Sequence, residues 1–552
     1  MDYSRMHLRA PLLWLLLPLV VGYALGEWVS VTGWAVLFGA GFTLVIGGCG
    51  VLWLARGWGT WLWLVVFPLG VVCMGWGYYE WRNLSMVPWA GKTPREAVVV
   101  VRVERLFATA DDSPVCSGTG VVREAPDYAR ELVGRRIYVA FNRKSESVVR
   151  TEVVRVAGVL RPLDSIAQSP GFIKYMRNLG LSAGIKQGRL LEVVEPGTAF
   201  QRFCARQKLR LTAALKAGAE PGNPYAGIFA GMMLGDKAEL DPEWRTAYLQ
   251  TGTMHLFAIS GLHVVAIAGC ISLFLGFVRI PLLPRVAIGL VLLTLYVEIT
   301  GAAPSAVRAL LMVYGYWLGK AVARQSTPFA AWTGSAMFVL LCEPRLLWDA
   351  GFQLSYLVVA GILLYGAPLS LWAEKLWQPY VLIPYANRTW GQRKLEEVYR
   401  WTVSALAVSV AASVASVPLT IMHFQTLPLV SLLLNLVLVP LSALIVITGM
   451  VSMALGLCGW MSAAGFVNHA AWLQIDLMNR SIGAAQPLPG AWFTLSFARA
   501  EVGLLLAGLL FATFLTVVPL NKKRPGAGWL LPLAVLVVGL DAALFLLPLG
   551  FM

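Results

Sequence analysis

The sequence predicts a polytopic α-helical membrane protein with an inserted, extracytoplasmic small β-barrel domain of the OB-like type. Composition is the first reason: of 552 residues, 58% are hydrophobic and only 13% are charged, and the mean hydropathy is +0.68. Soluble proteins are about 45–50% apolar and about 25% charged. The second reason is that the apolar residues occur in long blocks, and the third is that one polar stretch, residues 81–222, interrupts them. A wholly soluble enzyme is therefore excluded.

Apolar segments long enough to cross a bilayer lie on both sides of the polar stretch. A span needs about 20 mostly apolar residues. Three candidates fill residues 1–81, the main membrane part follows over residues 223–500, and two more apolar segments fill residues 501–552. The candidates after the polar stretch are residues 253–278, 281–300, 305–323, 328–342, 353–372, 401–422, 427–456, 463–482, 502–520 and 529–550. Segment 463–482 contains His469, Asp476 and Arg480, so it either crosses the membrane or lies flat on it.

Residues 82–198 have the pattern of a small β domain. Five short, β-branched or alternating runs are separated by turn residues, at 97–103, 118–122, 136–141, 148–156 and 190–194. Strands at this spacing are typical of a small barrel, of which the OB-fold is a five-stranded example. The stretch 81–222 holds 23 Lys and Arg against 13 Asp and Glu, so it supplies +10 of the chain's net charge of +15.

A basic amphipathic helix is expected within residues 199–222. One side would carry Phe200, Phe203, Cys204, Leu211, Ala214 and Leu215, and a second side would carry Arg202, Arg206 and Arg210 at i, i+4 and i+8. This arrangement suits a helix in the lipid headgroup layer, in contact with anionic lipid or another polyanion. A solvated linker helix is the alternative.

The distribution of Lys and Arg predicts the orientation in the membrane. If the amino terminus is cytoplasmic, three spans place the polar insert outside. Alternation then places every later basic cluster inside: Arg279 with Arg285, Lys320 with Arg324, the loop 375–400, and Lys522, Lys523 and Arg524. Cytoplasmic loops are enriched in these residues, so the arrangement is self-consistent.

The cysteines indicate no metal site. No pair has the spacing of a zinc motif, and five of the seven lie in or beside apolar runs. Cys116 and Cys204 fall in polar sequence, where they either form an external disulfide or remain free.

Polar residues inside the apolar segments are the candidate functional groups, because charged groups in a bilayer are costly and tend to be functional. The densest group is Asp236, His255, Ser260, Gly261 and His263. Asp236 follows an apolar stretch too short to span, as in a re-entrant element. A carboxylate and two imidazoles could ligate a metal in a hydrolytic site, but the eight-residue histidine spacing is not that of a metalloprotease helix. A water-facing polar patch is the favoured interpretation, and purely structural hydrogen bonding is a further alternative.

Four more polar residues lie in later apolar helices. Arg308 falls one turn into a helix that begins near Pro304, where a guanidinium can pair with a carboxylate, contact a phosphate or snorkel to the interface. Gln353, Ser355 and Asn435 are uncharged, and such residues bond neighbouring helices more often than they touch a substrate. Together these groups could line an aqueous path. No G-x-x-x-x-G-K-[ST] motif is present, so the sequence shows no recognisable nucleotide-driven motor.

The segment around Asp236 and His263 resembles the central signature of the ComEC family of DNA-internalisation competence proteins. The segment reads MMLGDKAELDPEWRTAYLQTGTMHLFAISGLHVVAI, and the likeness continues through TGAAPSAVRALLM, DAGFQLSYLVVAGI and LPLVSLLLNLVLVPLSALIV in the family's order. Upstream, VAGVLRPLDSIAQSPGFIKYMRNLGLSAGI is similar to the end of that family's extracellular OB-like domain.

The resemblance implies a channel in the bacterial inner membrane that passes single-stranded DNA into the cytoplasm during natural transformation. The motif positions carried over as pore-lining or packing residues are Asp236, His255, Ser260, Gly261, His263, Arg308, Gln353, Ser355 and Asn435. Arg202, Arg206 and Arg210 would contact DNA or lipid. The expected partners are single-stranded DNA, membrane lipids, a DNA receptor on the outer side, a cytoplasmic helicase and a separate nuclease.

No cofactor, metal or enzymatic activity is expected. Longer family members carry a metallo-β-lactamase-like domain with an H-x-H-x-D-H motif, which is absent here. Two rival functions remain open at this point: a membrane-embedded, metal-dependent hydrolase that uses Asp236, His255 and His263, and a transporter of small solutes.

Overall fold

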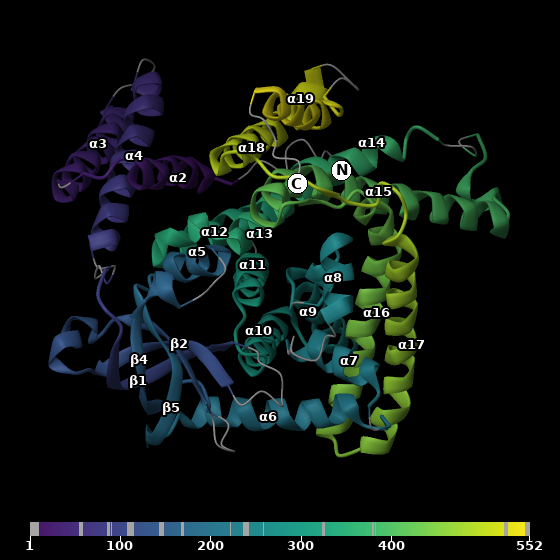
Figure 1. Cartoon of the computed structure of the whole chain (residues 1–552). Coiled ribbons are helices and arrows are strands. Elements are labelled where there is room, and N and C mark those ends of the chain that lie inside the picture. Colours follow the sequence, from purple (N-terminus) through teal and green to yellow (C-terminus); the bar gives the residue numbers. More distant parts are fainter. Residues whose placement is uncertain are drawn as a thin grey trace. The chain divides into compact units, whose positions relative to one another are not determined.

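The computed structural model describes residues 10–31, 33–54, 59–84, 89, 91–107, 115–142, 148–166, 170–220, 222–235, 242–257, 259–322, 326–377, 380, 382–523 and 528–546. The fold is helical with one closed barrel (Figure 1), as the sequence predicted. Two compact units can be recognised. The amino-terminal unit contains residues 10–207 and 333–352, and the core unit contains residues 208–332 and 353–552. Asp236 lies outside the described residues.

Three apolar helices begin the amino-terminal unit: α2 (Leu13–Trp28), α3 (Trp34–Leu54) and α4 (Gly59–Leu84). Glycines allow their backbones to approach closely. A Cβ at Gly41 of α3 would lie 2.5 Å from the carbonyl oxygen of Gly70 in α4, and one at Gly22 of α2 would lie 2.3 Å from the carbonyl oxygen of Val72. Helices in lipid associate through such packing, because no hydrophobic effect drives them together.

The barrel of this unit has five strands: β1 (Arg95–Phe107), β2 (Val115–Glu124), β3 (Arg136–Asn142), β4 (Val153–Pro162) and β5 (Ala183–Glu195). It closes in the order β1-β2-β3-β5-β4, with β3 and β5 parallel and the other pairs antiparallel. This closed five-stranded order fits the OB-fold. The five predicted runs all lie in or beside strands, but the fourth strand begins at Val153, five residues later than predicted.

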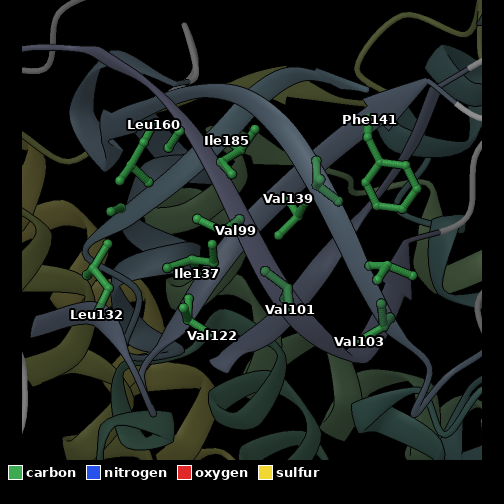
Figure 2. Packing of buried hydrophobic residues seen from close by; sticks show 14 of the residues in the cluster. Val99, Val101, Val103, Val122, Leu132, Ile137, Val139, Phe141, Leu160 and Ile185 are labelled. Carbon is green, nitrogen blue, oxygen red and sulfur yellow. The ribbon is translucent and has the colours of Figure 1, made fainter. Parts of the chain in front are cut away.

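Alternating β-branched residues fill the barrel. Val99, Val101 and Ile137 are at most 1% exposed, and they point into one core together with Phe141 and Ile185 (Figure 2). Burial of apolar side chains of this size contributes roughly 1.5–3 kcal/mol each. The barrel therefore has a conventional water-excluding core of its own.

Polar contacts join the barrel to its neighbours within the same unit. Glu343, which follows α12 (Pro328–Cys342), lies 3.3 Å from Arg136 of β3 and 3.4 Å from Arg82 of α4. Arg136 also pairs with Glu104 of β1 at 2.8 Å. Asn178, at the end of α5 (Pro170–Asn178), donates from Nδ2 to the Trp348 carbonyl oxygen at 3.0 Å. The barrel is thus attached to α4 and to the segment after α12 by ion pairs and hydrogen bonds.

The core unit is almost entirely helical. Its helices are α7 (Pro224–Leu234), α8 (Pro242–Gln250), α9 (Gly261–Phe277), α10 (Leu282–Ile299), α11 (Pro304–Ala321), α13 (Ala350–Gly361), α14 (Ala367–Ala373), α15 (Trp390–Phe424), α16 (Ser431–Leu457), α17 (Met461–Ala485), α18 (Ala500–Lys523) and α19 (Leu531–Leu546). Helices α16 and α17 form a long hairpin (Figure 1). A two-stranded pair, β6 (Thr426–Leu427) with β7 (Phe493–Thr494), ties the α15–α16 loop to the α17–α18 loop.

Seven helices among the described residues are long and apolar enough to cross a membrane. They cover Leu62–Leu84, Met254–Phe277, Leu282–Ile299, Ala350–Ala373, Trp390–Phe424, Ser431–Leu457 and Glu501–Asn521. Helix α17, which corresponds to the ambiguous segment 463–482, is not among them. The chain is therefore a multi-pass membrane protein.

Helix α6 (Ala199–Lys216) is the basic helix that the sequence predicted. Arg202, Arg206 and Arg210 are exposed, and Cys204, Leu211, Ala214 and Leu215 are buried. Phe200 and Phe203, which the sequence assigned to the apolar side, are 49% and 38% exposed. Cys116 and Cys204 are both buried, and of the two alternatives left open for them the structure does not form the disulfide.

Val99→Ala should destabilise the barrel by roughly 2 kcal/mol, because it removes methyl groups from a fully enclosed position. Proteolysis of the barrel in the purified full-length protein, followed over a urea series, would measure the loss. The matched control is Val98→Ala on the same strand, where the side chain is 49% exposed and the effect should stay within about 0.5 kcal/mol. Equal effects of the two substitutions would contradict the assigned inward face of β1.

Candidate functional site

The polar residues singled out in the sequence come from the ends of several helices of the core unit. Ser260, Gly261 and His263 begin α9, Arg308 lies in the second turn of α11, and Asn435 lies in the second turn of α16. Gln353 and Ser355 lie in the first two turns of α13. Their side chains have different surroundings, which the following contacts define.

Ser260 and His263 form a capping box at the start of α9. The Ser260 Oγ accepts from the His263 backbone N–H at 3.4 Å, and the Ser260 backbone N–H donates to His263 Nδ1 at 3.2 Å. Because Nδ1 accepts this hydrogen bond, the neutral ring carries its proton on Nε2. His263 is 1% exposed, and among the described residues Nε2 has no hydrogen-bond partner. The first role of this pair is to close the helix terminus.

His255 has a different environment from His263. Its side chain is exposed and its Nδ1 lies 3.1 Å from the Gly252 carbonyl oxygen. Within the described ranges no three His, Cys, Asp or Glu side chains gather as they would around a metal ion. The two histidines thus make separate local bonds, one to Gly252 and one to Ser260.

Arg308 connects α11 to α13. Its Nη2 donates to the Ser355 Oγ of α13 at 3.0 Å, and the residue is only 5% exposed. One turn earlier in α11, the Ser305 Oγ donates to the Ile259 carbonyl oxygen at 2.7 Å. A buried guanidinium is costly unless its donors are used. Helix α11 therefore bonds both to the segment that leads into α9 and to α13.

Gln353 continues the connection to α15. Its Oε1 lies 2.9 Å from Nε2 of His423, the penultimate residue of α15, so the imidazole N–H donates to the amide oxygen. Sequence reasoning missed His423 as a site residue. Its place at the end of an apolar helix was the available signal, but the partner is 70 residues away.

These contacts link the segment before α9 to α11, α11 to α13, and α13 to α15, and we call the residues that make them the polar chain. It runs from α9 through α11 and α13 to α15 and consists of Ser260, His263, Ser305, Arg308, Ser355, Gln353 and His423. All its members lie within the first or last two turns of their helices or cap them. Chemically it offers amide, hydroxyl and imidazole groups and one cation.

Two of the predicted residues remain outside the polar chain. Asn435 has a buried Oδ1 with no hydrogen-bond partner among the described residues. Gly261 lies at no unusually close helix contact, because a Cβ there would meet the Ala309 Cβ at 3.7 Å, an ordinary distance. A methyl group would fit at this position.

A second polar group on α17 was missed from sequence. Asn468 and Asn479 are buried, and Asn479 accepts a hydrogen bond from the Tyr248 hydroxyl of α8. Asp476 accepts from the Tyr225 hydroxyl of α7 at 2.8 Å. Asparagines 11 residues apart share one face of a helix, so their spacing was a signal for a polar inner face.

The aromatic residues of the barrel mostly pack internally. Phe141 is 2% exposed, and Phe107 and Tyr138 stack with ring centroids 6.4 Å apart in a small cluster beside α5. Burial raises the pKa of the Tyr138 hydroxyl. Tyr128 is 38% exposed, although its hydroxyl donates to the Glu96 carbonyl oxygen at 2.5 Å. Of these four rings, Tyr128 is the most accessible to a ligand.

The fold and the polar chain define a class: a polytopic membrane protein with an OB-type barrel and hydrogen-bonded polar groups in its helical core. A sequence model of the family described as "Competence protein" matches residues 232–521, which is more than half of the chain. The chain belongs to this family, the ComEC competence proteins, as the sequence motifs indicated.

Three curated relatives give the extent of the likeness. The chain is 32% identical over 228 residues to ComE operon protein 3 of Bacillus subtilis, covering 41% of this chain and 26% of the relative. It is 25% identical over 288 residues to Recombination protein 2 of Haemophilus influenzae, covering 50% and 34%. It is 28% identical over 278 residues to Competence protein ComA of Neisseria gonorrhoeae, covering 48% and 36%. The chain thus spans about a quarter to about a third of these relatives. No solved structure matches it.

The Gln353–His423 hydrogen bond should couple α13 to α15 energetically. Hydrogen bonds between membrane helices contribute about 0.6–1.7 kcal/mol in double-mutant cycles. The cycle Gln353→Leu, His423→Leu and the double variant should therefore give a coupling of about 1 kcal/mol in unfolding of the purified protein in mixed micelles.

The control cycle pairs Gln353→Leu with Tyr296→Phe, which removes the separate bond from the Tyr296 hydroxyl to the Met233 carbonyl oxygen. That pair should be additive within about 0.5 kcal/mol. Additivity in the Gln353–His423 cycle as well would show that this link of the polar chain contributes nothing.

Proposed function

We propose that this protein is a channel for uptake of single-stranded DNA during natural transformation. The observation that carries the proposal is the polar chain: hydrophilic side chains at the ends of four helices, three of them apolar enough to span a bilayer, connect each helix to the next through hydrogen bonds. A strand of nucleic acid can cross about 30 Å of hydrocarbon only along hydrophilic groups. Arg308 adds a buried guanidinium, the side chain best suited to a phosphate.

Charge supports a polyanionic substrate. The stretch 81–222 supplies +10 of the net charge of +15, and an OB-type barrel is a common binder of oligonucleotides. The exposed stripe of Arg202, Arg206 and Arg210 on α6 would contact the DNA backbone or anionic headgroups. A transporter of small solutes would have no evident use for this charge.

The proposal includes a location and partners. The protein would lie in the bacterial inner membrane with its amino terminus in the cytoplasm and the barrel outside. It would receive DNA from a receptor on the outer side and depend on a cytoplasmic helicase for driving force. It would carry no catalytic activity itself, and a separate nuclease would remove the second strand. The match to the family described as "Competence protein" and the likeness to a relative named Competence protein ComA support this role.

The metal-dependent hydrolase is the less favoured function. His255 bonds to Gly252 and His263 caps α9, so the two imidazoles already have local structural partners. The third suggested ligand, Asp236, is outside the described residues. No observation in the described part of the chain favours this function over the channel.

Arg308→Met should lower the entry of labelled DNA into transformable cells at least tenfold, because it removes the only cation of the polar chain. Deletion of the whole gene in the native organism should abolish entry, and Arg308→Lys should retain an intermediate rate. Arg480→Met on α17, where the side chain is 77% exposed, is the control and should leave entry unchanged. Normal entry in the deletion strain would refute the proposed function.

The arginine stripe on α6 should act through its charge. Replacement of Arg202, Arg206 and Arg210 by Glu should reduce transformation severalfold or weaken binding to vesicles that contain anionic lipid, with the loss largest at low salt. The matched triple Lys variant keeps the charge and should behave as the parent protein. If the Glu variant matches the parent in both assays, the stripe has no role in DNA or lipid contact.

A further inference from the structure

The carboxyl end of α6 docks on the α16–α17 hairpin, and every residue of the contact belongs to the core unit. The Asn468 side chain of α17 donates from Nδ2 to the carbonyl oxygens of Ala214 at 2.8 Å and Ala217 at 3.0 Å. Its Oδ1 accepts from the Ser452 Oγ of α16 at 2.6 Å. Helix ends leave carbonyl groups without intrahelical partners. Asn468 supplies donors to these groups, and both Asn468 and Ser452 are fully buried.

Small residues complete this contact, which we call the α6 socket and define by Ser452, Gly456, Gly465 and Asn468. A Cβ at Gly456 would lie 2.3 Å from the Ala214 Cβ, and one at Gly465 would lie 3.3 Å from the backbone of Ala217. Any larger side chain at Gly456 would push α6 away. The socket is therefore specific in both shape and hydrogen bonding.

The composition of α6 fixes its depth in the membrane. It carries five basic residues and no acidic one, and Arg202, Arg206 and Arg210 are exposed. Insertion of each Arg or Lys into the hydrocarbon centre costs about 2.5–3.5 kcal/mol. Helix α6 therefore lies outside the hydrocarbon, and hydrogen bonds of 2.8–3.0 Å hold the socket at that same level.

The turn of the hairpin has the composition of a membrane surface as well. Helix α16 ends at Leu457, Gly459 has a φ of +83°, and α17 begins at Met461. Trp460, between them, is 65% exposed. Tryptophan is enriched at the interface between headgroups and hydrocarbon.

We propose that Asn468 is the positioning residue that fixes the end of the basic helix α6 on the α16–α17 turn, so that α6 and this turn lie at the same face of the membrane. Strict alternation of the predicted spans gives the opposite result. Seven predicted spans, from 253–278 to 427–456, separate α6 from the turn, and an odd number of crossings would put them on opposite faces. An odd number of those seven segments therefore does not cross.

The same hairpin also holds α7, which leads into the family motif. A Cβ at Gly449 would lie 2.6 Å from the Met233 sulfur, so α7 is packed tightly on α16, and the Tyr225 hydroxyl bonds to Asp476 on α17. Helices α6 and α7 are thus both held by the α16–α17 hairpin. Only this last step, a link between a DNA-gathering helix and the transport path, rests on the proposed function.

Labelling with a membrane-impermeant maleimide tests the shared face. Cys458 is exposed at the turn and Leu209 is 69% exposed on α6. Two full-length proteins are compared, one that retains only Cys458 and one in which Leu209→Cys supplies the only cysteine. Both should react in spheroplasts, or both only in inverted vesicles. Reaction from opposite sides would overturn the proposal.

Proteolysis tests the role of Asn468. Asn468→Asp replaces the two donors with a carboxylate that repels the α6 carbonyl groups, and Asn468→Leu removes them without charge. In both variants trypsin should cleave at Arg206, Lys208 or Arg210 several-fold faster than in the parent. The matched control is Asn479→Asp, on the same helix but bonded to Tyr248 of α8, which should leave α6 protected. Equal cleavage in all variants, or the same increase in the control, would refute the role of Asn468 in holding the end of α6.

Neither readout depends on DNA. The labelling and proteolysis results could be as expected while deletion of the gene leaves transformation intact. That combination would refute only the proposed function. Opposite-face labelling in a protein that is required for transformation would refute the shared face alone.

Discussion

Inside a bilayer, a polar group can be satisfied only by the protein itself or by water that the protein admits, and this constraint organises the core unit. Apolar helices gain no hydrophobic stabilisation from meeting each other in lipid. Their association depends on close backbone contact and on polar side chains that find partners. Arg308 with Ser355 and Gln353 with His423 provide such partners between helices. The same requirement places Asn468 at the end of α6, where its side chain donates to the backbone carbonyl groups of Ala214 and Ala217.

The barrel is stabilised in a different way, because its apolar core is formed by the hydrophobic effect as in a water-soluble domain. Its stability comes from an apolar core of β-branched residues such as Val99, Val101 and Ile137, which the hydrophobic effect drives inward. Its attachment to α4 and to Glu343 is ionic and therefore sensitive to salt. One chain thus combines two assembly principles, with α6 as the covalent connection between them.

Sequence was sufficient for the features that depend on local periodicity. The apolar blocks, the five barrel strands and α6 all follow from patterns within 10–30 residues. It failed where the partner is remote. His423 meets Gln353 across 70 residues and Asn468 meets Ala214 across 254, and no local pattern encodes either pair. A helical wheel likewise shows which side of α6 is apolar but not which residues the protein covers: Phe200 and Phe203 are exposed, whereas Cys204 and Leu211 are buried.

Some buried polar atoms of the core unit, both in the polar chain and outside it, have no hydrogen-bond partner among the described residues. The imidazole of His263 commits Nδ1 to Ser260, so its remaining N–H points into a buried space, and in the described part of the chain it meets no acceptor. The Asn435 Oδ1 is a buried acceptor in the same condition. Each such group costs about 1–3 kcal/mol when nothing pairs with it. A helix cap needs only the Nδ1 side of a histidine, and an apolar residue at position 435 would remove the second penalty. Stability alone does not explain the presence of either group. A path for water and phosphate oxygens, in contrast, requires donors and acceptors that are not already hydrogen-bonded within the protein.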